Sequence, residues 1–117
     1  MFKLTFFSPN ITTQKKYDLI WGRKVDCAFR KKVVQIAKNI GLPQEKYEGA
    51  NWLMAVMALE TQKTFNPSKQ NSFGYTGLIQ FGNAAASRLG TTTSALKIMS
   101  AINQLNYVEK YFSLKEF

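Results

Sequence analysis

Histidine is absent from the chain, and cysteine occurs once, as Cys27, among its 117 residues. Without histidine, neither a Ser-His-Asp triad nor a Cys-His pair can form, and the usual mixed His and Cys ligand sets of zinc are excluded. A single cysteine can form no disulfide within the chain. We therefore assign Cys27 no role and expect no metal site and no cofactor.

Long hydrophobic runs are also missing. No stretch reaches the roughly 18 apolar residues that a transmembrane helix needs. The apolar-leaning run after Lys3 is far shorter than the hydrophobic region of a signal peptide. We expect the protein to be made in the cytoplasm without a signal peptide and not to insert into a membrane. Any action outside the cytoplasm would then require delivery by another factor.

Carboxylates are scarce: the 7 Asp and Glu face 16 Lys and Arg, which gives a net charge of +9. No aspartate follows Asp26, and the later acidic side chains are Glu45, Glu48, Glu60, Glu109 and Glu116. A surface of this sign attracts polyanions such as nucleic acid, anionic lipid or an acidic polymer. Charge alone does not choose among these partners.

The composition that is present suits a folded domain. The chain is 45% hydrophobic and 14% aromatic, which is too rich in aromatic residues for a disordered chain. Residues 1–20 form an N-terminal segment in which FKLTFF fits a short strand, and residues 21–117 form one domain. We expect a mainly α fold with a small loop or hairpin region at residues 61–77, where Asn, Ser, Gly and Thr are frequent.

Helical spacing of apolar residues recurs along the domain. Helices are predicted from Asp26 as N-cap to Ile40, from a start between Pro43 and Asn51 to Leu59, from Asn83 to Leu89, from Thr92 to Met99, and from Ser100 to Phe112. The second of these has apolar residues on every side, which predicts a buried helix.

Glu60 lies at the C-terminal end of that apolar helix. The negative pole of the helix dipole disfavours an anion there, and an apolar helix removes water from the carboxyl. Both effects favour the protonated acid, which is the form that a general acid needs. The alternative is an exposed Glu at a frayed helix end, and the local sequence favours neither interpretation over the other.

A series of short motifs favours the general-acid interpretation of Glu60. In order they are Glu60-Thr61, Phe65-Asn66-Pro67, Gly77 to Phe81, Ala84 to Ala86, Leu89 to Thr92, Met99 to Ala101, and Gln104 to Phe112. In this order and spacing the chain resembles lytic transglycosylase catalytic domains of the lysozyme-like superfamily, to which goose-type lysozymes also belong. The last three motifs resemble the variants encoded by phages and prophages. The resemblance covers about Phe29 to Phe112.

The resemblance implies cleavage of the β-1,4 bond between N-acetylmuramic acid and N-acetylglucosamine in bacterial peptidoglycan. A single Glu does this chemistry in the family, which agrees with the absence of Asp after Asp26. The implied product is a 1,6-anhydromuramoyl end, and attack by water would instead give lysozyme-type hydrolysis. The implied partners are peptidoglycan glycan strands and further phage or cell-wall machinery, with no nucleic acid. We expect a monomer that acts on the cell wall or periplasm after delivery, or as part of a phage particle.

Position by position, Glu60 matches the catalytic acid of the family, and Gln80 matches the Gln that lines the sugar groove. Gly77 matches a glycine that lets backbone approach closely. Asn71 falls where many members carry a Ser near the catalytic carboxyl, and its side chain can donate in a similar way. Thr61 replaces a Ser conservatively.

Aromatic residues complete the expected groove. Among Phe73, Tyr75 and Phe81, we expect Phe81 to pack inward and Tyr75 to contact sugar. Many relatives continue into an Ala-Tyr-Asn-Ala-Gly motif whose tyrosine contacts the acid, and this motif is absent here. Tyr107 or Tyr111 would supply the hydroxyl instead, although their spacing of four residues equally fits a half-buried aromatic stripe.

Two other classes of function remain open at this stage. The net charge and the Lys- and Arg-rich residues 23–38 suit a nucleic-acid-binding helical domain, but that function leaves Glu60 and the Gly77 to Gln80 motif without a reason. A catalytically silent structural module of a phage tail or secretion apparatus would not need the acid.

Overall fold

The computed structural model describes residues 17–114, so the strand predicted in FKLTFF lies outside the described residues. The described chain is a single, mainly helical globule, as predicted. Its helices are η2 (Gly22–Lys24), α2 (Cys27–Asn39), η3 (Glu45–Tyr47), α3 (Glu48–Glu60), α4 (Asn83–Arg88), α5 (Thr93–Lys97) and α6 (Ala101–Ser113).

Three helices begin at side-chain caps that the sequence predicts. Oδ1 of Asp26 accepts a hydrogen bond from the backbone N–H of Phe29 at 2.8 Å, at the start of α2. Thr92 caps α5 and Ser100 caps α6 in the same way. Each cap satisfies a backbone donor that has no partner within its helix, which explains why these helices begin where they do.

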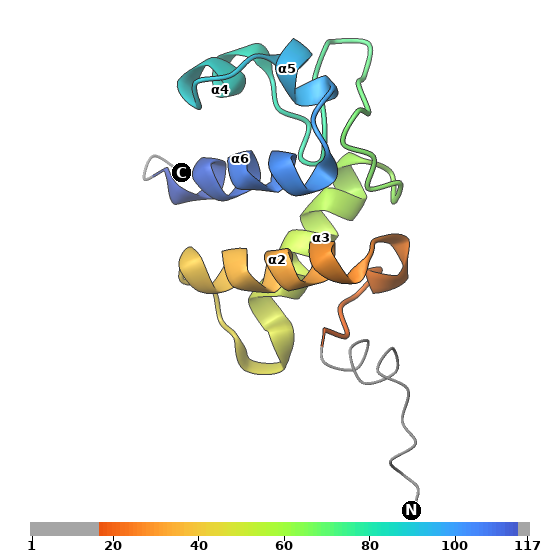
Figure 1. The fold of residues 1–117 in the computed structure, drawn as a ribbon, viewed down its shortest axis with the longest axis vertical. Coiled ribbons are helices and arrows are strands. Elements are labelled where there is room, and N and C mark those ends of the chain that lie inside the picture. Colours follow the sequence, from red (N-terminus) through yellow and green to blue (C-terminus); the bar gives the residue numbers. More distant parts are fainter. Residues whose placement is uncertain (1–16, 115–117) are drawn as a thin grey trace, which may run out of the picture.

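The long helices pack around one core. In Figure 1, α2 and α6 lie alongside each other with α3 crossing behind them, and α4 and α5 lie beyond α6. α2 packs against both α3 and α6. The fully buried side chains of the core come from these helices and from the segment before α4; they include Val33, Ile36, Leu53, Met54, Met57, Leu78, Phe81, Leu105 and Val108.

The segment between α3 and α4 is an ordered loop. Within the described residues no strand forms, but isolated antiparallel bridges join Gln70 to Thr76 and Thr76 to Phe81. Thr76 is fully buried, and its backbone N–H donates to the carbonyl of Phe81 at 2.9 Å. These pairings make the small hairpin-like region expected at residues 61–77 and extend it to Phe81.

One expectation about α3 is wrong. The helix is not buried on every side, because Trp52 is 49% exposed and Leu59 is 77% exposed. The opposite side of the helix, with Leu53, Met54 and Met57, faces the core. The apolar residues of α3 therefore lie partly in the core and partly on the surface of the protein.

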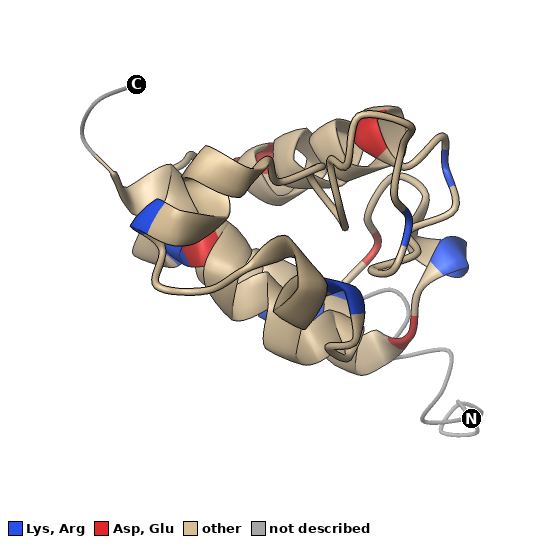
Figure 2. Cartoon of the chain, turned by 90° about the horizontal axis from the view of Figure 1, so that it is seen from above, with Lys and Arg blue, Asp and Glu red and all other residues tan. Residues whose placement is uncertain are grey.

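Figure 2 shows Lys and Arg on several elements of the described chain. Among the helices of residues 17–114, none is long and apolar enough to cross a membrane.

Candidate active site

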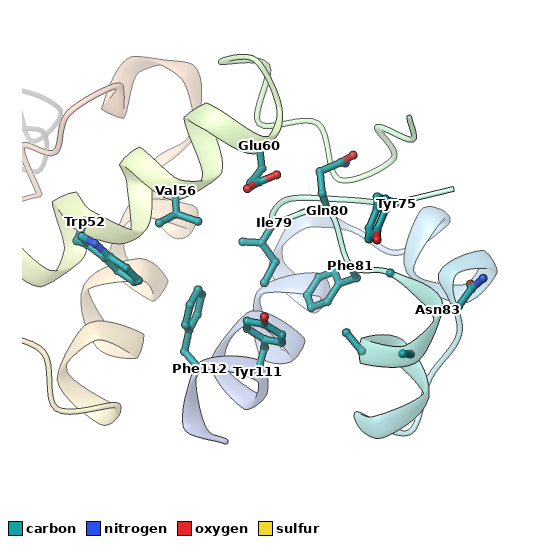
Figure 3. A pocket seen from close by; sticks show the side chains of 13 residues that line it. Trp52, Val56, Glu60, Tyr75, Ile79, Gln80, Phe81, Asn83, Tyr111 and Phe112 are labelled. Atoms are coloured by element: carbon teal, nitrogen blue, oxygen red, sulfur yellow. The ribbon is translucent and has the colours of Figure 1, made fainter. Parts of the chain in front are cut away.

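Glu60 lies in a cleft where two depressions meet. The side chain is exposed and lines both of them, together with Tyr75, Ile79 and Gln80. The two halves of this cleft have volumes of about 560 and 650 Å³, each within the range of ligand sites in proteins. In Figure 3 the carboxylate projects from the end of α3 toward Ile79 on the opposite wall. Glu60 thus stands near the middle of an elongated cleft.

The first half of the cleft is mostly apolar. Trp52 and Val56 extend from α3 and face Tyr111 and Phe112 of α6, as Figure 3 shows. The rings of Trp52 and Phe112 meet edge to face at a centroid distance of 5.4 Å, and Phe112 meets Tyr111 at 5.1 Å. Tyr111 in turn packs edge to face on Phe81. This chain of edge-to-face contacts fixes the ring positions along the apolar half.

The second half of the cleft is polar. It is lined beyond the shared residues by Leu59, Gln62, Lys69, Gln70 and Asn71. Within residues 17–114, Lys69 is the one cation that lines either half. The polar half therefore offers hydrogen-bond donors and acceptors and one positive charge. The apolar half, in contrast, offers aromatic rings.

The expected removal of water from Glu60 is not found. Its side chain is exposed, because the helix end opens into the cleft instead of being covered by neighbouring segments. Thr61, the next residue, is fully buried and fixes the helix end. Its hydroxyl donates to the carbonyl of Met57 at 2.7 Å and accepts from the N–H of Phe65 at 2.9 Å. The resulting turn holds the C-terminal end of α3 in place.

Gln80 faces Glu60 across the cleft from a left-handed backbone conformation, with φ of 58°. Its Nε2 donates to the carbonyls of Gly77 and Lys69, each at 3.0 Å. These bonds hold the amide beside the cleft while its oxygen stays available as an acceptor. Gln62, which also lines the cleft, has a positive φ of 55° as well.

Gly77 belongs to the turn that carries Gln80 and supports the cleft from inside the protein. It is buried, has φ of 91°, and does not line either half of the cleft. A Cβ on this residue would collide with the amide of Gln104, 2.8 Å from its Cδ. The close approach that the sequence predicts at Gly77 is therefore a contact with a buried side chain of α6.

Gln104 is a fully buried polar residue that sequence reasoning missed. Its Oε1 accepts from the N–H of Leu78 at 2.7 Å, and its Nε2 donates to the carbonyls of Pro67 and Leu96, each at 2.9 Å. One side chain thus joins α6 to the turn that carries Gln80, to the loop after Glu60, and to α5. The only sequence signal was its place in the Gln104 to Phe112 motif.

Tyr75 takes the place expected of a groove aromatic. It is 46% exposed and lines both halves of the cleft. Its ring lies against Gly82, where a Cβ would come within 2.7 Å of Cε1. Phe81 is buried as predicted, whereas Phe73 is 84% exposed and does not line the cleft.

Asn71 lines the polar half, but its amide oxygen has a local task. Oδ1 accepts from the backbone N–H groups of Phe73 at 2.9 Å and Tyr75 at 3.0 Å. This turn shapes the rim that carries Tyr75. The Nδ2 amino group is the part of Asn71 that can donate toward a ligand.

Of the two tyrosines considered as partners of the acid, only Tyr111 lines the cleft with Glu60. Tyr111 lines the apolar half of the cleft, whereas Tyr107 lines a separate depression with Arg88 and Lys110. The ammonium of Lys110 lies 4.9 Å from the centroid of the Tyr107 ring. The two rings, four residues apart on the same side of α6, thus line different depressions.

No metal-binding cluster accompanies the cleft: within residues 17–114, no group of three or more His, Cys, Asp and Glu side chains is placed to hold an ion. Comparison of the chain with protein-family models, with curated proteins and with solved structures found no match.

Proposed function

We propose that this protein cleaves the β-1,4 bond between N-acetylmuramic acid and N-acetylglucosamine in peptidoglycan, with Glu60 as general acid and then general base. The observation that carries the proposal is the position of Glu60, the only carboxylate among the described residues that line either half of the cleft. A glycan strand lying along both halves would pass a linking oxygen over this carboxyl.

The reaction needs only one carboxyl group. Glu60 donates its proton to the glycosidic oxygen, and the acetamido group of the substrate stabilises the cation that develops at the anomeric carbon. The Glu60 carboxylate then accepts a proton from the C6 hydroxyl, which closes a 1,6-anhydro ring. If water enters instead, the same base activates it and the product is a reducing end.

The absence of a second acid in the cleft favours this mechanism over one with two carboxylates. Retaining and inverting glycosidases place two carboxyl groups about 5–5.5 Å or 6.5–9.5 Å apart across the scissile bond. Among the described residues that line the cleft, Glu60 has no acidic neighbour.

The exposed carboxyl gains its function when substrate covers it. A glycan lying over Glu60 excludes water, and the apolar wall of Val56 and Ile79 surrounds the acid on the covered side. Desolvation favours the neutral acid, which is the form that protonates the leaving oxygen. Substrate binding thereby supplies the desolvation that the free protein lacks.

The mainly helical fold, with Glu60 at the end of a helix and Gln80 on the facing turn, is consistent with the lysozyme-like domain that the motifs indicate. The net charge of +9 suits a wall whose peptide stems and attached polymers are anionic. A nucleic-acid-binding function is less favoured, because Lys69 is the one cation among the described residues that line the cleft.

The test compares Glu60→Gln with Glu45→Gln, a change at an exposed Glu that does not line the cleft. Both variants lose one negative charge, so the net charge of the protein changes equally. We expect Glu60→Gln to release soluble fragments from purified peptidoglycan at least about 100-fold more slowly than the wild type. Glu45→Gln should keep the wild-type rate. Equal rates in the two variants would refute the role of Glu60, and salt-sensitive DNA retardation without wall lysis would favour nucleic-acid binding.

A further inference from the structure

Trp52 is an exposed aromatic residue at the far end of the cleft from Lys69. Its side chain is 49% exposed and lines the apolar half of the cleft. The same side chain also lines a further depression of about 430 Å³, formed with Leu42, Pro43, Glu48, Gly49 and Asn51. Trp52 therefore stands between the cleft and a second surface hollow.

The position of the indole is fixed by its neighbours. Its edge-to-face contact with Phe112 has a centroid distance of 5.4 Å and an interplanar angle of 72°. Phe112 is itself held by Tyr111 at 5.1 Å. A large aromatic side chain with two torsion angles loses little entropy when a ligand stacks on it, and these contacts reduce that loss further.

Helix geometry sets the distance between Trp52 and the acid. Trp52, Val56 and Glu60 follow one another at intervals of four residues, which places them along one side of α3 and in the same half of the cleft. Eight residues of α-helix correspond to about 12 Å along the axis. That length is about that of two linked sugar rings.

We propose that Trp52 forms a distal glycan-binding subsite, where a sugar ring of the same strand stacks on the indole about two rings from the bond that Glu60 cleaves. This inference rests on the proposed function and adds a substrate preference to it. Strands that reach Trp52 are bound and cleaved better than fragments that occupy only the surroundings of Glu60.

The chemistry of the hollow suits an uncharged sugar. A pyranose ring has an apolar face, which matches the indole, and a rim of hydroxyl groups, which needs polar partners. Glu48 offers acceptor oxygens, and Asn51 can donate through Nδ2 because its Oδ1 accepts from the N–H of Ile20 at 3.0 Å. Among the described residues, Glu48 is the one charged residue that lines the hollow, so an acidic peptide or a nucleic acid would be repelled there.

Intrinsic fluorescence tests this subsite directly, because the chain has only 2 tryptophans, Trp21 and Trp52. In the variant Trp21→Phe combined with Glu60→Gln, Trp52 is the only indole and cleavage is blocked. The probes are β-1,4-linked N-acetylglucosamine oligomers. We expect the hexasaccharide to quench or shift the emission at concentrations where the disaccharide has no effect. Unchanged emission at a saturating concentration of hexasaccharide would overturn the proposal.

Kinetics provides the second arm, with Trp21→Ala as the matched control because Trp21 is 37% exposed and does not line the cleft. We expect Trp52→Ala to lower kcat/KM for polymeric glycan roughly tenfold, with a smaller loss on a trisaccharide, while Trp21→Ala matches the wild type. Circular dichroism verifies that both variants are folded.

The outcomes separate the two proposals. If wall cleavage depends on Glu60 but Trp52→Ala loses equal activity on long and short substrates, the distal subsite is wrong and the proposed function stands. If the Trp52 emission responds to long oligomers but the wild type cleaves no wall, the subsite stands and the proposed function is wrong.

Discussion

The substitution Gly77→Ala tests how the cleft is supported from inside. At φ of 91°, alanine would have to adopt a left-handed backbone conformation, which costs an L-residue roughly 1–2 kcal/mol. Its Cβ would also displace the Gln104 amide. The N–H of the buried Leu78 would then lose its 2.7 Å hydrogen bond, at a cost of about 1–3 kcal/mol.

Gly90 provides a matched control for the backbone effect. It has φ of 79°, but a Cβ there would meet no atom within 4 Å. Gly90→Ala should therefore cost only the conformational part, roughly 1–2 kcal/mol. The difference between the two variants, about 1–3 kcal/mol, isolates the contact with Gln104.

Thermal unfolding followed by circular dichroism measures this difference. We expect Gly77→Ala to unfold well below Gly90→Ala, by about 4 °C for each kcal/mol of difference. Amide exchange of Leu78 should also accelerate in Gly77→Ala and stay slow in Gly90→Ala. If both variants unfold at the same temperature, the packing of Gln104 against Gly77 does not contribute to stability and the argument fails.

Two further predictions concern the buried polar side chains beside the cleft. Thr61→Val keeps the shape but removes the partner of the Phe65 N–H, so we expect a loss of about 1–3 kcal/mol in denaturant unfolding. Thr61→Ser keeps the hydroxyl and should lose about 1 kcal/mol or less; equal losses would contradict the hydrogen-bond argument. Gln104→Met keeps the length but leaves the Leu78 N–H without its acceptor, and we expect a loss above about 2 kcal/mol with rapid amide exchange at Leu78. Wild-type exchange at Leu78 in this variant would show that another group holds the turn.

Local signals in the sequence were sufficient for the starts of α2, α5 and α6. The caps at Asp26, Thr92 and Ser100 are satisfied within three residues of each helix start, so a short window of sequence contains all the groups involved. The burial of α3 could not be predicted in this way. An apolar pattern identifies apolar residues, but Trp52 and Leu59 face a cleft and not the core.

The parts of the site that sequence reasoning missed depend on tertiary contacts. Tyr107 and Tyr111 have the same chemistry and lie one helical turn apart, so only the segments that pack beside each turn of α6 distinguish them. Gln104 pairs with Leu78, 26 residues earlier in the chain, and no local pattern records such a contact. The sequence motifs, in contrast, predicted that Glu60 and Gln80 belong to one groove, and both residues line one cleft in the structure.

The most direct test of the role of Glu60 is mass spectrometry of the muropeptides that the wild type and Glu60→Gln release from purified peptidoglycan. We predict 1,6-anhydromuramoyl ends from the wild type and almost no fragments from the variant. Reducing ends that depend on Glu60 would support its role as general acid but would show that the reaction is hydrolysis and not transglycosylation. The same fragments in the same amounts from both proteins would contradict the claim that Glu60 carries the reaction.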